Sequence, residues 1–111
     1  MREIIINEIR VSGTLQGMPE LRTRVLEDKT KEYSVRGFLR QRRNSWTDEN
    51  GRTNYSYNMF QFRAKGDAAE QLAKRISPGM GVILTGSLQV AYSRGEYVTY
   101  IQVESVKTTG D

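Results

Sequence analysis

The sequence contains no cysteine and no histidine. Without cysteine there is no thiolate nucleophile, and without histidine there is no imidazole base. The common zinc sites also need these side chains. We therefore expect a binding protein and not an enzyme, with no catalytic residues, no bound metal and no cofactor.

Long hydrophobic runs are also missing. No stretch approaches the roughly 18 apolar residues that span a bilayer. The run Ile4–Ile6 is too short for a secretory signal. We therefore expect no membrane contact and a cytoplasmic location. The length of 111 residues predicts one domain over 1–107 and a short C-terminal end at 108–111.

The positive charge is concentrated in one segment. Seventeen Lys and Arg against thirteen Asp and Glu leave a net charge of +4. Residues 33–47 hold no acid and carry the whole excess on four arginines, together with Phe38 and Trp46. These arginines are Arg36, Arg40, Arg42 and Arg43. Guanidinium groups hold phosphates while rings stack on bases, so the segment suits single-stranded nucleic acid. The alternative is a solvated basic strand face beside an acidic neighbour.

Periodicity and turn residues predict five strands and one helix. The polar segment 22–32 is interpreted as a loop or mobile connection. The strands are expected at 4–15, 33–43, 53–65, 82–92 and 97–107, with Asn50-Gly51 as a hairpin turn.

The helix is expected to follow the third strand. Asp67 is a candidate N-cap, and Glu70 completes a pattern that resembles a capping box. Ala68, Leu72 and Ile76 form one apolar stripe, and Pro78 with Gly79 ends the helix.

Three strands, a helix and two strands predict an all-β fold, a five-stranded OB barrel with one short helix. An α+β sheet with a helix on one face would have a similar order. The barrel is favoured because five strands bury little surface unless the sheet curls. Glycines within the strands are candidate bends or points of close backbone approach: Gly13, Gly37 and Gly86.

Several motifs resemble the bacterial single-stranded DNA-binding (SSB) proteins. Residues 7–15 with Pro19-Glu20-Leu21-Arg22 resemble the opening of that family, and 57–63 resemble its third strand. Residues 69–82 resemble its helix and the entry to strand four. The last hairpin is matched at 86–89 and 97–99. The resemblance covers 7–106, although 23–32 is longer and more charged than the family turn.

The resemblance implies positions that contact DNA. Phe62, Trp46 and Tyr92 lie at or near aromatic positions that stack on bases in the family. A further such position falls on Ser56, which Tyr55 and Tyr57 flank. Each ring could instead fill the core. The cations expected to contact the DNA are Arg36, Arg40, Arg42, Arg43, Arg52, Arg63, Lys65 and Arg94.

The second strand has two opposite faces. Val35, Gly37 and Leu39 are expected to point inward, because unpaired arginines are almost never fully buried. The outward residues are then Arg36, Phe38, Arg40 and Arg42.

The resemblance also implies a function and partners. The chain resembles a short, tail-less SSB that binds single-stranded DNA with little sequence preference in replication, recombination or repair, in the nucleoid. RNA stays open as a ligand. A homodimer or homotetramer is implied, and Ile4–Ile6 are candidates for its interface. Replication or restart proteins are further candidate partners. The alternatives are an accessory protein of the primosomal replication protein N type, and an OB module that binds protein or oligosaccharide.

Overall fold

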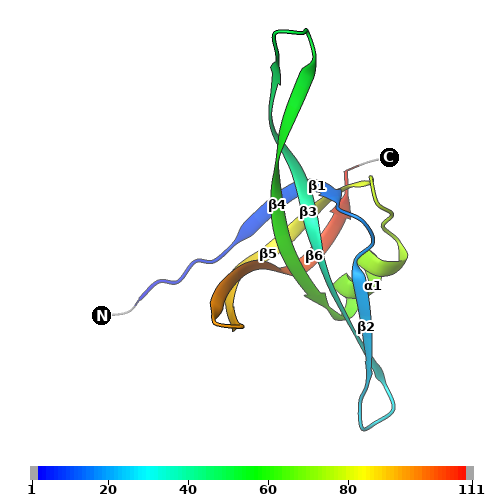
Figure 1. The fold of residues 1–111 in the computed structure, drawn as a ribbon. Coiled ribbons are helices and arrows are strands. Elements are labelled where there is room, and N and C mark those ends of the chain that lie inside the picture. Colours follow the sequence, from blue (N-terminus) through cyan, green and yellow to red (C-terminus); the bar gives the residue numbers. More distant parts are fainter. Residues whose placement is uncertain (1–2, 110–111) are drawn as a thin grey trace.

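In the computed structural model, residues 3–109 are described, and they form six strands and one helix (Figure 1). The strands are β1 (Ile9–Leu15), β2 (Glu20–Val25), β3 (Lys31–Thr47), β4 (Thr53–Lys65), β5 (Gly81–Ser93) and β6 (Glu96–Thr108). The helix is α1 (Gly66–Lys74). No helix in this part of the chain is long and apolar enough to cross a membrane. The last two residues of the expected C-terminal end, 110 and 111, lie outside the described residues.

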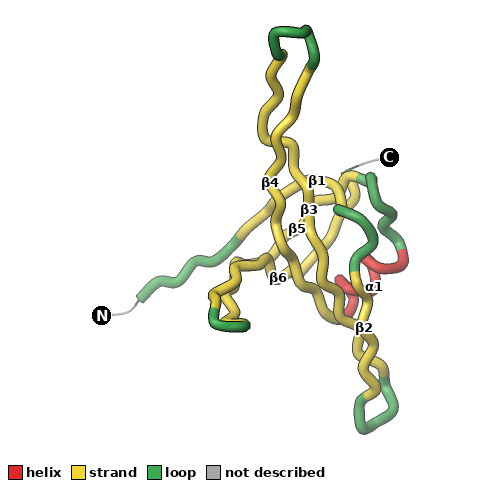
Figure 2. Tube along the Cα trace, in the orientation of Figure 1, coloured by secondary structure: helices red, strands yellow, loops and turns green. Residues whose placement is uncertain are grey.

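The strands close into a barrel. Their order in the sheet is β1-β5-β6-β4-β3-β2, and β1 also pairs with β3 at Thr14↔Arg40 and Leu15↔Leu39. The β4–β6 pairing is parallel, as at Phe62↔Ile101, and the other pairings are antiparallel. The helix follows β4 in the chain and lies at one end of the sheet (Figure 2). This closure confirms the predicted OB barrel, and the open α+β sheet is not observed.

The core lies inside this barrel and under α1. Leu39, Phe62, Leu84 and Ile101 are fully buried, and each such side chain contributes about 1.5–3 kcal/mol by leaving water. From the helical region, Ala68, Ala69, Leu72 and Ile76 pack into the same cluster. The predicted apolar stripe is therefore confirmed for Ala68 and Leu72, whereas Ile76 packs in the core from beyond the end of α1.

The helix ends differ from those predicted. Lys65 is the N-cap, its side chain makes no capping hydrogen bond, and Asp67 lies in the first turn. The capping-box prediction is wrong because β4 runs directly into the helix through Gly66, which has a φ of 63°. At the other end Arg75 is the C-cap, three residues before Pro78.

The segment 22–32, expected as a loop, forms a hairpin. Strand β2 pairs with the start of β3 from Glu20↔Arg36 to Val25↔Lys31. Every residue of β2 is exposed, because the hairpin projects beyond the barrel. Its residues do alternate, with Leu21 and Val25 on one face and Glu20, Arg22 and Arg24 on the other, but the apolar positions are too few to predict a strand.

The first strand is shorter than predicted. It begins at Ile9, and Ile4–Ile6 precede it with exposed side chains. The Asn7 side chain is held by β5. Its Nδ2 donates to the Leu88 carbonyl at 2.7 Å, and its Oδ1 accepts from the Leu88 backbone amide at 2.8 Å. The ladder between β1 and β5 ends at Ile9↔Gly86, where the β5–β6 register shifts. A Cβ at Gly86 would collide with the Gln102 carbonyl oxygen, so close backbone approach requires glycine there.

Candidate nucleic-acid interface

The β3–β4 hairpin extends well beyond the barrel (Figure 1). Its pairing continues to Thr47↔Thr53, and a turn over 48–52 closes it. The Asp48 carboxylate accepts hydrogen bonds from the backbone amides of Arg52 (2.9 Å) and Asn50 (3.0 Å) and from the Asn54 side-chain amide (3.1 Å). These bonds favour the ionised form and hold the pKa of Asp48 below its ordinary value of 3.8.

The lowered pKa predicts a pH-sensitive hairpin tip. Ionised Asp48 stabilises the turn fully above pH 3.8, and this contribution is lost as the pH falls through the lowered pKa. We expect the fluorescence anisotropy of Trp46, two residues away, to decrease on acid titration below that value. Asp48→Asn keeps an oxygen acceptor but does not titrate, so its profile should lack this step. An acid step of equal size in both proteins would contradict the assignment.

The outward face of this hairpin is set by the strand register. Phe38 lies opposite Gln61, and Arg40 lies opposite Met59. Directly opposite residues in an antiparallel pair share a face. On the other face Val35 and Leu39 are buried, so the predicted inward and outward sets of β3 are confirmed.

Two arginines stack on two tyrosines on this outward face. The guanidinium carbon of Arg40 lies 4.6 Å from the ring centroid of Tyr57, and that of Arg42 lies 4.2 Å from the ring centroid of Tyr55. The two rings are 6.5 Å apart and about two-fifths exposed. Neither arginine forms a salt bridge with any residue in 3–109. This arginine–tyrosine ladder (Arg40, Arg42, Tyr55 and Tyr57) therefore presents flat π surfaces and unneutralised charge together.

Phe62 is not part of this face. Its side chain is 0% exposed and packs in the core, where it covers Gly37 so closely that a Cβ there would lie 2.7 Å from the ring. The prediction that Phe62 stacks on a base is wrong. Strand β4 alternates, so Phe62 points inward, whereas Met59 and Tyr57 point outward.

Trp46 is exposed, but it does not share a face with the ladder. A β-bulge lies between Arg42 and Asn44, and beyond it Trp46 pairs with Asn54 while Tyr55 pairs with Ser45. A shift of one residue moves a side chain to the other face of a strand. Trp46 therefore lies on the opposite face of the hairpin from Tyr55 and Tyr57. Its exposed fraction of 52% leaves its ring available to a ligand.

The remaining predicted residues lie in three places. Arg43 and Arg52 are exposed in the outer part of the β3–β4 hairpin. Tyr92 and Arg94 lie at the tip of the β5–β6 hairpin, which leaves the barrel in another direction (Figure 1). Tyr92 packs edge-on against Tyr97 with ring centroids 5.0 Å apart. The last three, Arg36, Arg63 and Lys65, lie on the outward face at the base of the β3–β4 hairpin.

Three residues beside these were not assigned to the site from sequence. Phe38 and Met59 are both 47% exposed on the outward face. Tyr100 lies under the guanidinium of Arg63, 4.1 Å from its carbon. Phe38 was identifiable from the register of its strand, but the contact of Tyr100 depends on the parallel β4–β6 pairing, for which the sequence has no local motif.

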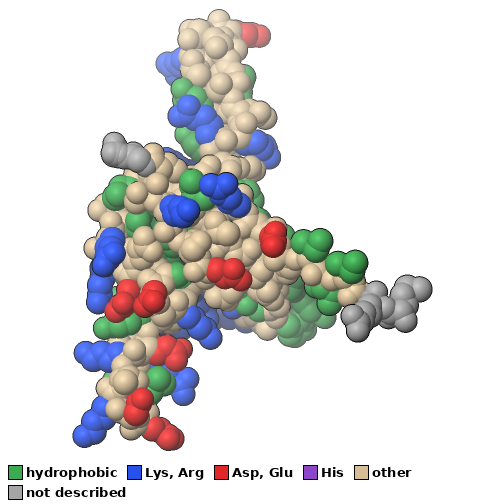
Figure 3. All heavy atoms as spheres, turned by 180° about the vertical axis from the view of Figure 1, so that it is seen from behind, with side chains coloured by type: hydrophobic (Ala, Val, Ile, Leu, Met, Phe, Trp, Pro, Cys, Tyr) green, Lys and Arg blue, Asp and Glu red, His purple; other side chains and the backbone are tan. Residues whose placement is uncertain are grey.

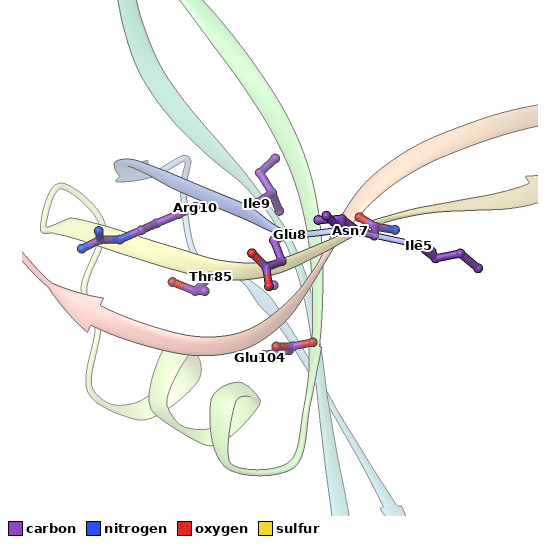
Figure 4. Close-up of a pocket in the computed structure, with 9 residues that line it drawn as sticks. Ile5, Asn7, Glu8, Ile9, Arg10, Thr85 and Glu104 are labelled. Carbon is purple, nitrogen blue, oxygen red and sulfur yellow. The ribbon is translucent and has the colours of Figure 1, made fainter. Parts of the chain in front are cut away.

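Charge differs between the surfaces of the molecule. The projecting β3–β4 hairpin carries basic side chains with acid only at its tip, whereas the β2–β3 hairpin carries both signs (Figure 3). A hollow of about 780 Å³ lies between residues 5–10 and strands β5 and β6. Glu8 and Glu104 line it with Arg10 (Figure 4). Two carboxylates against one arginine make that hollow a poor site for phosphate.

The strand order, the parallel closure between β4 and β6 and the helix between β4 and β5 define an OB-fold protein with a basic, aromatic outer hairpin. Two solved structures of SSB proteins are similar to it. A deletion mutant of the single-stranded DNA binding protein from Thermus aquaticus aligns with a TM-score of 0.68 and 19% identity, over 95% of this chain and 51% of that chain. The Plasmodium falciparum SSB in complex with ssDNA aligns with a TM-score of 0.65 and 15% identity, over 99% of this chain and 100% of that chain.

These similarities show that the chain has the fold of SSB proteins. The chain spans about half of the Thermus aquaticus chain. No protein-family model matches the sequence, and no curated protein matches it.

Proposed function

We propose that this protein binds single-stranded DNA with little sequence preference. The observation that carries the proposal is the arginine–tyrosine ladder on the outward face of β3 and β4. Guanidinium groups bind phosphates, and exposed rings stack on bases whatever their identity. The similar Plasmodium falciparum SSB, solved with ssDNA, supports the same ligand.

Binding alone accounts for this activity. The arginines neutralise phosphates and release counterions, while tyrosine rings and the planar guanidinium groups stacked on them offer surfaces to bases. No bond is made or broken, so we propose a non-enzymatic role that needs no metal or cofactor.

The test is a salt titration of oligo-dT binding, followed by the fluorescence anisotropy of a labelled oligo-dT. The emission of Trp46, the single tryptophan of the chain, shows in parallel whether the ligand also reaches its face of the β3–β4 hairpin. We expect saturable binding that weakens as salt rises. Absence of binding even in dilute buffer would overturn the proposal, and oligo-rU in the same assay would measure any preference for DNA over RNA.

Removing the two ladder arginines should change the salt dependence. If Arg36, Arg40, Arg42 and Arg43 each neutralise one phosphate, log K should fall with log salt at a slope of roughly −3. The double variant Arg40→Ala/Arg42→Ala should flatten the slope by about one to two units.

The matched control for this slope is Arg10→Ala/Lys107→Ala. It removes the same charge from exposed positions on β1 and β6, away from the ladder. Its slope should stay near that of the parent protein. Equal flattening in both variants would mean that net charge, and not the ladder, governs binding.

We also propose an assembly and a setting. The exposed Ile4–Ile6 support a homodimer or homotetramer, which sedimentation would reveal as a multiple of the chain mass. DNA replication, recombination or repair, in the cytoplasm and nucleoid, is the setting that this activity fits. Contacts with replication proteins belong to the same proposal, and binding to a restart helicase would favour a primosomal accessory role.

A further inference from the structure

A basic hollow lies at the base of the β3–β4 hairpin, on the same outward face as the ladder. Its volume is about 270 Å³. Arg22, Arg36, Arg63 and Lys65 line it, with Tyr100 and Ser34. We call this site the basic hollow.

The strand register brings these residues together. Arg22 on β2 lies opposite Ser34 on β3, and Ser34 lies opposite Lys65 on β4. Arg36 lies opposite Arg63 in the same pairing of β3 with β4. Because opposite residues share a face, all of them lie on one side of the sheet.

The hollow carries four cations, and no acidic side chain lines it. Glu20 lies beside it and accepts from Nε of Arg22 at 3.0 Å, but both side chains are more than half exposed. An exposed pair of this kind neutralises little charge. The hollow therefore keeps an excess of positive charge that an anion would offset.

Arg63 is fixed in place and incompletely bonded. Its guanidinium carbon lies 4.1 Å from the ring centroid of Tyr100, on the neighbouring strand β6. Its Nε is buried and has no hydrogen-bond partner among residues 3–109. Buried donors are normally paired, so an arginine held in this way favours an anionic oxygen acceptor.

We propose that the basic hollow binds an internal phosphodiester of the DNA strand, as a second contact point beyond the ladder. This inference rests on the proposed function. Arg36 and Arg40 are four residues apart on one strand, which is about 13 Å. A DNA strand must therefore be long enough to span that distance before it contacts both the ladder and the basic hollow.

The test compares the dinucleotide (dT)2, whose single phosphodiester cannot occupy the ladder and the basic hollow together, with a long oligo-dT of about 16 nucleotides, the upper end of the site sizes of OB folds. The variant Arg22→Ala/Lys65→Ala removes two exposed side chains from the hollow. We expect its salt slope for the long strand to flatten by about 0.7–1.4 units, with no change for the short strand bound at the ladder.

The matched control is Arg24→Ala/Lys31→Ala, which removes two exposed cations from the same β2–β3 hairpin but outside the hollow. Its slopes should equal those of the parent protein. An unchanged long-strand slope in Arg22→Ala/Lys65→Ala would overturn the inference and leave the proposed function standing. Failure of the parent protein to bind either strand would overturn both.

Two additions test whether the basic hollow binds a different phosphate. One is a 5′-phosphate on the short strand, and the other is free inorganic phosphate. We expect neither addition to reveal a difference between the parent protein and Arg22→Ala/Lys65→Ala. A gain from the 5′-phosphate that only the parent protein shows would assign the hollow to strand ends. Competition by inorganic phosphate with long-strand binding that the variant lacks would assign it to the free anion. Either result overturns the proposal of an internal phosphodiester.

Discussion

Replacing Tyr55 and Tyr57 together by alanine should weaken oligo-dT binding by about 2–6 kcal/mol, because each stacked base contributes about 1–3 kcal/mol. This corresponds to a rise in Kd of between about thirty-fold and about twenty-thousand-fold. The substitution also frees the Arg40 and Arg42 guanidinium groups from the rings that hold them. Anisotropy of a labelled oligo-dT at low salt measures the change.

The control for this effect is Tyr55→Phe/Tyr57→Phe, which keeps both rings and the cation–π contacts and removes only the hydroxyl groups. It should bind nearly as tightly as the parent protein. If the alanine variant, shown to be folded, also binds within about three-fold of the parent, base stacking at the ladder is refuted.

The second large effect concerns stability and not binding. Phe62→Ala should lower the free energy of unfolding by about 3–5 kcal/mol, because it leaves a cavity among fully buried neighbours. Urea denaturation measures this loss directly. The folded fraction should bind oligo-dT with unchanged affinity, since the ring is not on the outward face.

A base-stacking role for Phe62 would give the reverse pattern, a lower affinity with stability unchanged. Phe62→Leu, which keeps most of the buried volume, should lose less stability than Phe62→Ala and bind normally. The pair of variants therefore separates a core residue from a ligand-binding one at this position.

The barrel was predictable because half-buried strands leave a two-residue period. In β3, Val35 and Leu39 alternate with Arg36, Phe38 and Arg40, and that pattern alone assigns inside and outside. The turn at Asn50-Gly51 was predictable as well, since glycine adopts its φ of 77° without strain.

Features that depend on contacts distant in sequence were not predictable in the same way. Strand β2 buries none of its residues, and its alternation of Leu21 and Val25 with charged residues is too short to predict a strand. Phe62 is a different case, because it lies five residues after Tyr57 and the local alternation along β4 already places the two rings on opposite faces. The bulge after Arg42 has no glycine to mark it, so the side on which Trp46 lies became apparent only from the pairing.

That bulge has a consequence for the shape of a bound ligand. Tyr55 and Trp46 lie on opposite faces of the β3–β4 hairpin, so no straight segment of polynucleotide contacts both rings. A polynucleotide that contacts both rings must bend around the edge of the hairpin. A ligand that contacts only the ladder and the basic hollow stays on one face, so a bend is required only when Trp46 is contacted as well.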